Sequence, residues 1–130
     1  MNILVGYDGS KVAADVLKLA REQAKAFDGK VIIVTSMVGG PEVLREDFEK
    51  AERELEFAKS GFKKEEIPCE ARLSVRGLEA GEDLVQFAEE NKIDLIVVGI
   101  RRRSRVQKLV FGSNAQYVIL EAPCPVLTVK

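Results

Sequence analysis

The sequence has no histidine and no tryptophan, and its only cysteines are Cys69 and Cys124. Without histidine the chain cannot form a Ser-His-Asp or Cys-His triad, or a zinc or haem site with a histidine ligand. Two cysteines 55 positions apart cannot supply a four-cysteine zinc site or an iron–sulfur cluster. We therefore interpret both as reduced, packed thiols, as expected in a cytoplasmic protein.

Long apolar runs and an excess of one charge are also missing. No run approaches the roughly 18 residues that span a bilayer, so no membrane partner is expected. The first ten residues, MNILVGYDGS, have neither a basic lead nor a cleavage site, which argues against a signal peptide. Twenty basic and twenty-one acidic residues leave a net charge of -1. That balance excludes a global field attracting polyanions such as nucleic acids, although a local patch is still compatible with it.

The 130 residues, of which 46% are hydrophobic and 32% charged, fit one globular domain over positions 1–130. Short aliphatic runs alternate with stretches in which apolar residues recur every three to four positions, the period of an α-helix. Strands are expected over residues 3–5, 31–34, 69–75, 94–99 and 126–129, and helices over about 11–27, 42–64, 79–91 and 112–122. This alternation predicts an α/β fold, a parallel sheet with helices on both faces.

Several local features accompany this pattern. Ser10 is a suitable N-cap for the first helix, and Gly29 suits a left-handed position at its end. Helical spacing directs Phe27 and Ile119 toward the core. Residues 69–75 alternate between apolar and polar, which predicts a strand with one wet face at the edge of the sheet.

Polar residues and glycines gather where the predicted strands end. Ligands of an open parallel sheet bind beyond the carboxyl ends of its strands. Asp8 follows the first strand, Ser36 follows the second, and Gly99 through Ser113 follow the fourth. Both the Walker A loop and the Rossmann G-x-G-x-x-G are absent.

Two of these positions allow two interpretations each. Gly112 and Ser113 open a helix, where backbone N–H groups attract anions, but the same pair also fits a simple N-cap and turn. Asp8 can accept hydrogen bonds from ribose hydroxyls or help to hold a metal. It can equally cap the first helix or form an Asx-turn with Gly9.

The segment from Ile100 to Lys108 holds five basic residues and no acidic one. Such a run is compatible with a solvated surface, with a clamp on phosphates, or with contact to a nucleic-acid backbone. No aromatic residue is interleaved for base stacking, which disfavours nucleic acid. No spacing of carboxylates marks an acid–base pair, so no catalytic residue is expected and binding is favoured over catalysis.

Three segments together resemble the universal stress protein family: ILVGYDGS, DLIVVG followed thirteen positions later by GS, and APCPVLTVK. The resemblance implies a three-layer α/β/α sandwich of the flavodoxin-like or adenine nucleotide α-hydrolase-like type. Its five-stranded parallel sheet would have the order 3-2-1-4-5. It also implies a cytoplasmic homodimer paired through strand 126–129, which functions in the stress response with a protein partner that the sequence does not identify.

ATP-binding members of that family carry G-x-x-G, nine residues, and then G-[ST]. Gly99, Gly112 and Ser113 match this motif, but Arg102 occupies the second glycine position. A left-handed backbone at an arginine costs about 1–2 kcal/mol, although the guanidinium can replace lost main-chain contacts with charge-assisted ones. The expected function is an ATP-binding sensor or switch. The alternative is a dimeric interaction protein in which Arg102 closes the nucleotide site.

The resemblance also implies roles for individual residues. Asp8 would meet the ribose or a nucleotide-bound Mg²⁺, the main chain of Ser36 would meet the adenine, and Gly99 would lie under the ribose. The phosphates would be held by Gly112, Ser113 and Asn114, with Arg102 and Arg103 as additions of this chain. The ligand would be ATP with Mg²⁺, or AMP or ADP, and any turnover would be slow ATP hydrolysis or autophosphorylation.

Overall fold

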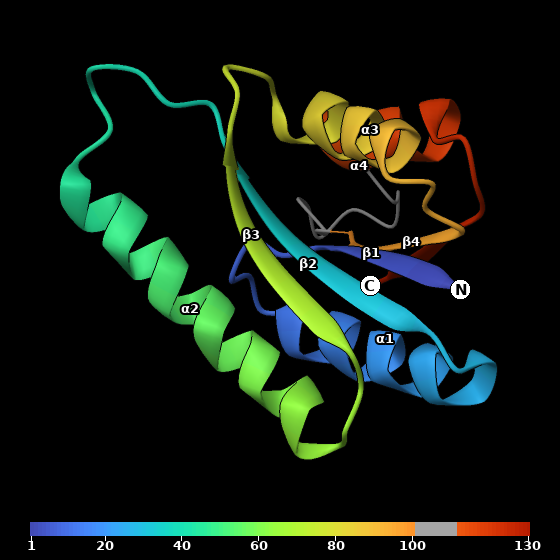
Figure 1. Cartoon of the computed structure of the whole chain (residues 1–130). Coiled ribbons are helices and arrows are strands. Elements are labelled where there is room, and N and C mark those ends of the chain that lie inside the picture. Colours follow the sequence, from blue (N-terminus) through green and yellow to red (C-terminus); the bar gives the residue numbers. More distant parts are fainter. Residues whose placement is uncertain (101–111) are drawn as a thin grey trace.

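A computed structural model of the chain describes residues 1–100 and 112–130. Strands and helices alternate along it, as the sequence predicts (Figure 1). The elements are β1 (Asn2–Gly6), α1 (Ala13–Phe27), β2 (Lys30–Met37), α2 (Arg45–Lys64), β3 (Cys69–Val75), α3 (Ala80–Glu90), β4 (Leu95–Gly99), α4 (Ser113–Glu121) and β5 (Val126–Val129).

The five strands form one parallel sheet in the order β3-β2-β1-β4-β5, which confirms the expected α/β fold and places β3 at an edge. The strand order reverses at β1, because β2 and β3 lie on one side of it and β4 and β5 on the other. Ile3 pairs with Val31 of β2 and with Leu95 of β4. Runs of β-branched and aliphatic residues fit these central positions, where both faces of a strand are covered.

Alternate residues of the central strands face two separate cores. Ile3, Val5 and Ile33 pack with the buried faces of α1 and α2. Leu4, Ile32 and Ile96 pack on the opposite face with α3 and α4. Figure 1 shows the resulting layers, with α1 and α2 below the sheet and α3 and α4 above it.

The ends of α1 differ from the expectation. The helix begins at Ala13 without a side-chain cap, and Ser10 contributes only its carbonyl oxygen, which accepts the Ala13 N–H at 3.0 Å. At the other end Asp28, with φ 50°, adopts the left-handed conformation expected of Gly29. Gly29 is needed instead for close packing, because a Cβ there would lie 3.1 Å from the Met1 carbonyl oxygen.

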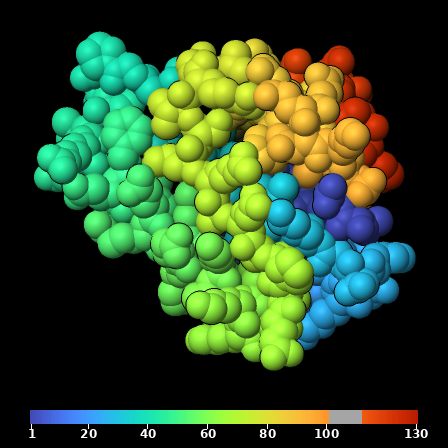
Figure 2. Space-filling model, viewed as in Figure 1, coloured from blue at the N-terminus to red at the C-terminus, as the bar shows by residue number. Residues whose placement is uncertain are grey.

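Some apolar side chains lie outside both cores. Phe27 is 57% exposed and Ile119 is 40% exposed, so the prediction that they face inward is wrong. Phe27 is the last residue of α1, and the buried residue of α4 is Val118, the neighbour of Ile119. In Figure 2 the residues of α2 form a prominent outer flank of the molecule. None of the helices within residues 1–100 and 112–130 combines the length and the apolar character needed to cross a membrane.

Candidate functional site

A cavity of about 390 Å³ opens at the carboxyl ends of β1, β2 and β4. This is the position where the strand order reverses and where ligands of such sheets bind. Its volume lies within the range of small-molecule sites. The floor includes Gly6, Ser36 and Gly99, one from the end of each strand. The walls come from the loop after β1 and from the four helices.

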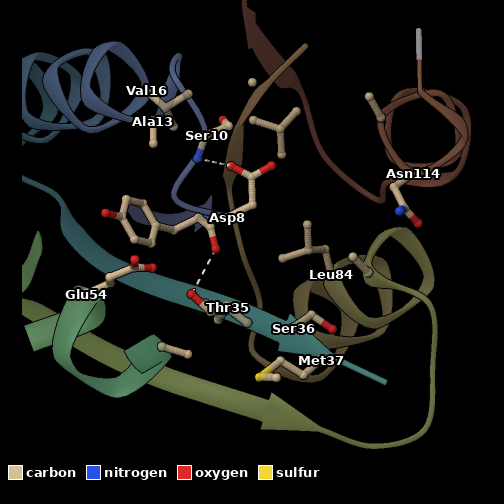
Figure 3. A pocket seen from close by; sticks show the side chains of 18 of the residues that line it. Asp8, Ser10, Ala13, Val16, Thr35, Ser36, Met37, Glu54, Leu84 and Asn114 are labelled. Atoms are coloured by element: carbon tan, nitrogen blue, oxygen red, sulfur yellow. Dashed lines mark hydrogen bonds between the residues drawn. The ribbon is translucent and has the colours of Figure 1, made fainter. Parts of the chain in front are cut away.

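The loop after β1 is held by its own hydrogen bonds. Asp8 accepts the Ser10 N–H through Oδ1 at 2.9 Å, which is the Asx-turn considered from the sequence. The Thr35 hydroxyl donates to the Tyr7 carbonyl oxygen at 2.8 Å and so joins this loop to β2. Asp8 also lines the cavity, so its turn role and its proximity to a ligand are compatible. Figure 3 shows both hydrogen bonds beside the cavity.

Ser36 presents its main chain and its side chain to different partners. The Tyr7 N–H donates to the Val34 carbonyl oxygen at 2.9 Å, so the peptide groups of Val34 face β1. Strand residues two apart direct their peptide groups to the same side, so those of Ser36 face the space beyond the end of β1. Ser36 lines the cavity there. Its hydroxyl donates to Asp83 Oδ2 at 2.5 Å.

Asn114 and Ala115, near the start of α4, line the opposite side of the cavity, whereas the predicted site residues Gly112 and Ser113 are not among its lining residues. Gly112 has φ −60° and ψ 152°, an extended conformation open to any residue, and no described atom lies within 4 Å of a Cβ built there. The first turn that follows, from Ser113, has backbone N–H groups without intrahelical acceptors. Asn114 lines the cavity from this turn. In Figure 3 it lies across the cavity from Glu54, with Asp8 between them.

Asn114 has a structural role that sequence reasoning missed. Its Oδ1 accepts the Gly81 N–H at 2.9 Å. Gly81 is the second residue of α3, where an N-cap side chain normally accepts this hydrogen bond, and α3 has no cap from its own N-cap residue Glu79. Asn114 therefore caps α3 from a helix 33 residues away in sequence.

Close packing explains why residue 99 is a glycine. A Cβ at this position would lie 2.5 Å from Val12 Cγ2 and 3.3 Å from Val16 Cγ2. The end of β4 therefore lies directly against the start of α1, and a larger residue would push the two apart. Gly99 also lines the cavity, beside Gly6 and Val98.

Sequence reasoning missed the contribution of α2. Asp47, Lys50 and Glu54 line the cavity from this helix. Glu54 Oε2 lies 3.0 Å from the position of a Cβ on Gly9. Burial raises the pKa of Tyr7, and the nearby charges of Glu54 and Asp8 raise it further. The helical pattern gave no sign of this placement, because charged residues on the polar face of a helix usually face only solvent.

Other residues considered from the sequence lie elsewhere. Arg102 and Arg103, with the rest of segment 101–111, are outside the described residues. Cys69 and Cys124 are half-buried free thiols. Burial raises the pKa of Cys69 to about 11 and also raises that of Cys124, so both stay protonated at neutral pH. The residues described contain no cluster of three or more acidic or cysteine side chains placed to hold a metal.

Asp83 lies next to the cavity. Among the described residues it has the one fully buried charged side chain, with 1% exposed. Burial opposes ionisation of this carboxyl, but hydrogen bonds from Ser36, Ser74 and Arg76 together hold its pKa below its ordinary value. Arg76 Nε donates to Oδ1 at 2.7 Å. Neither Asp83 nor Arg76 stands out in the sequence, because the partners come from three separate elements.

Acid unfolding is expected to depend on Asp83. Its folded pKa lies below the unfolded value of about 3.9, so the stabilisation is complete above that value and is lost as the pH falls through the folded pKa. Asp83→Asn should be about 1–3 kcal/mol less stable at pH 7 and should lose less stability on acidification. Urea unfolding from pH 7 to about pH 2 measures both effects. Parallel pH profiles of the two proteins would contradict this assignment.

Known proteins match this chain in sequence and in fold. The sequence model of the universal stress protein family matches residues 1–130. A universal stress protein of Thermus aquaticus is 37% identical, over 98% of this chain and 97% of that protein. The solved universal stress protein of Archaeoglobus fulgidus has a TM-score of 0.91 and 42% identity, covering 100% of this chain and 98% of that one.

A second structure from Archaeoglobus fulgidus, of a universal stress protein in complex with dAMP, has a TM-score of 0.86 and 39% identity. The match covers 100% of this chain and 98% of the Archaeoglobus fulgidus chain. The family model, the relative from Thermus aquaticus and the two solved structures each cover at least 98% of the chain. On this evidence the chain belongs to the universal stress protein family.

Proposed function

We propose that this chain binds an adenine nucleotide in the cavity at the carboxyl ends of β1, β2 and β4, and that it acts as a stress-response sensor or switch. The observation that carries the proposal is the arrangement of donors and acceptors around the cavity. Peptide groups of Ser36 face one side of it, and the N-terminus of α4 lies on the other. The 39% identical relative solved with dAMP supports the same ligand class.

The charges around the cavity orient the nucleotide. Asp8, Asp47 and Glu54 line it together with a single described lysine, Lys50. Carboxylates accept hydrogen bonds from ribose hydroxyls and repel phosphates, so the sugar belongs beside Asp8. The phosphates belong at the α4 N-terminus, where helix geometry favours anions and no atom of the described residues lies within 4 Å of a Cβ built on Gly112.

ATP with Mg²⁺ is the proposed ligand, and AMP or ADP would occupy the same base and ribose positions. Asp8 is the residue proposed to lie near a nucleotide-bound Mg²⁺. Calorimetric titration with ATP, with and without Mg²⁺, and with AMP tests the proposal, together with an assay for nucleotide co-purified with the protein. Micromolar affinity for an adenine nucleotide is the expected result. The absence of both heat and co-purified nucleotide would contradict it.

Arg102 separates this proposal from its alternative, a dimeric interaction protein with a closed nucleotide site. Arg102→Gly restores the second glycine of the family motif. If the guanidinium contributes contacts to phosphates, the substitution should weaken ATP binding by about tenfold, the worth of one hydrogen bond between charged groups. Titration of both proteins measures the difference. Binding that occurs only in the variant would support the alternative.

Asn114→Asp is expected to preserve the fold and weaken phosphate binding. A carboxylate keeps the acceptor for the Gly81 N–H, and negative charge near a helix N-terminus stabilises by about 0.3–1 kcal/mol. The same charge should lower affinity for AMP by about tenfold or more and leave affinity for adenosine nearly unchanged. Calorimetry with both ligands measures this. An equal loss for adenosine and AMP would place the phosphate away from α4.

We also propose that the protein is a homodimer paired through strand 126–129. β5 is an edge of the sheet whose Val126, Leu127 and Val129 are only half-buried. Neighbouring α4 exposes Leu120 to 69%. The other edge, β3, carries charged residues, which discourage strand pairing. Sedimentation should give the mass of a dimer, and Leu120→Lys should lower that mass. The control Phe57→Lys, at a 79% exposed residue of α2, should leave it unchanged.

A further inference from the structure

The first turn of α3 makes two hydrogen bonds to residues on opposite sides of the cavity. Two residues apart in this turn, the Gly81 N–H donates to Asn114 Oδ1 at 2.9 Å, and Asp83 Oδ2 accepts the Ser36 hydroxyl at 2.5 Å. Asn114 and Ser36 both line the cavity, and so do Ala80 and Leu84 of the same helix. One rigid turn therefore joins the end of β2 to the start of α4.

The turn is fixed tightly against α4. A Cβ on Gly81 would lie 2.8 Å from the Asn114 carbonyl oxygen and 3.0 Å from its Cα, so the two backbones are in direct contact. Backbone atoms cannot give way as the end of a flexible side chain can. A shift of α3 toward α4 would therefore also displace the α4 N-terminus.

The turn is fixed equally tightly to the sheet. Arg76, which follows β3, contacts Asp83 Oδ1 through Nη2 at 2.6 Å and donates to Glu90 Oε1 through Nη1 at 2.6 Å. Glu90 is the last residue of α3, so one guanidinium is bonded to both ends of the helix. The buried carboxylate of Asp83 is thus paired with Arg76, which fixes the position of the oxygen that accepts the Ser36 hydroxyl.

A buried charge needs a reason, because well-packed apolar residues are often at least as stabilising as a buried ion pair. Asp83 lies where an apolar side chain would leave the Ser36 hydroxyl without this acceptor. We propose that Asp83 is a positioning residue, which orients the Ser36 peptide for the nucleobase and, through Gly81 and Asn114, sets its separation from the phosphate end of the cavity. This inference rests on the proposed nucleotide site.

Two serines provide a matched test, because Ser36 and Ser74 are paired across β2 and β3 and both hydrogen-bond to Asp83. Of these two serines, Ser36 lines the cavity and Ser74 does not. Ser36→Ala and Ser74→Ala should lower stability by similar amounts. In calorimetry well below each Tm, affinity for AMP should fall about tenfold in Ser36→Ala, equivalent to one lost hydrogen bond, and stay within about twofold in Ser74→Ala.

Two further variants distinguish positioning from direct contact. Ser36→Thr keeps a hydroxyl donor and should restore most of the affinity. Asp83→Asn should also weaken AMP binding, and combining it with Ser36→Ala should add little, because both changes remove the same interaction. Fully additive losses would show that the Ser36 hydroxyl touches the ligand itself, which would overturn the proposal.

The outcomes separate this inference from the proposed function. If the wild-type chain binds AMP and the two serine variants lose affinity equally, or neither loses any, the positioning role is wrong and the nucleotide site stands. If the wild-type chain binds neither AMP nor ATP, both are wrong. Thermal unfolding of every variant shows that each titration uses folded protein.

Discussion

Replacing Gly112 with valine is expected to lower affinity for AMP by at least about 100-fold, with less than about 1 kcal/mol change in the free energy of unfolding. The backbone at Gly112 is extended, and valine adopts that conformation readily. No atom of the described residues lies within 4 Å of the added Cβ, so nothing in residues 1–100 or 113–130 obstructs it. The new methyl groups would occupy the space through which the proposed phosphate would approach the first N–H groups of α4.

The size of this effect follows from the contacts that would be lost. Hydrogen bonds to a charged group contribute about 1.5–3 kcal/mol each, and blocking the helix N-terminus removes at least two such donors. Calorimetry with AMP and adenosine measures the loss, and adenosine, which has no phosphate, should be affected much less. The mass in solution should equal that of the wild type. Unaltered AMP affinity in Gly112→Val would show that the phosphate binds elsewhere.

Alanine should have opposite effects at two helical glycines. Gly61→Ala, inside α2, should stabilise the protein by about 0.5–1 kcal/mol, because alanine restricts the unfolded chain. The added Cβ there would meet Arg21 Nη1 at an ordinary 3.6 Å. Gly81→Ala should destabilise by about 1–3 kcal/mol, because its Cβ would meet the Asn114 carbonyl oxygen at 2.8 Å and α3 and α4 would have to separate.

Urea unfolding of the two variants beside the wild type measures both effects under the same conditions. Gly61→Ala is the control, because the chemical change is identical and only the neighbouring atoms differ. Affinity for AMP should fall in Gly81→Ala as well, since the start of α4 moves with the contact. A Gly81→Ala protein as stable as the wild type would show that the two helices separate without cost.

The sheet could be predicted because its determinants are local. The runs around Ile33 and Val97 are β-branched or aliphatic at every position, which indicates a strand covered on both faces. The alternation in β3 indicated an edge, and the structure confirms this. The rule that ligands bind at strand carboxyl ends placed Asp8, Ser36 and Gly99 around one cavity, and all three line it.

The contacts that hold the cavity together could not be predicted in this way. Asp83 is one of several acidic residues at the start of a helix, and its burial depends on hydroxyls from two strands. Asn114 caps a helix other than its own. Glu54 reaches the cavity only because α2 lies beside the end of the sheet. Each of these contacts joins elements far apart in sequence, and periodicity reports only on neighbours along the chain.

The cap that Asn114 provides for α3 also makes one backbone amide a reporter of motion. The Gly81 hydrogen is protected from exchange with solvent water only while Asn114 Oδ1 accepts it. Whenever the start of α4 moves away, that hydrogen becomes free to exchange, even if the rest of α3 stays folded. The exchange rate of this single amide therefore measures how often this side of the cavity opens.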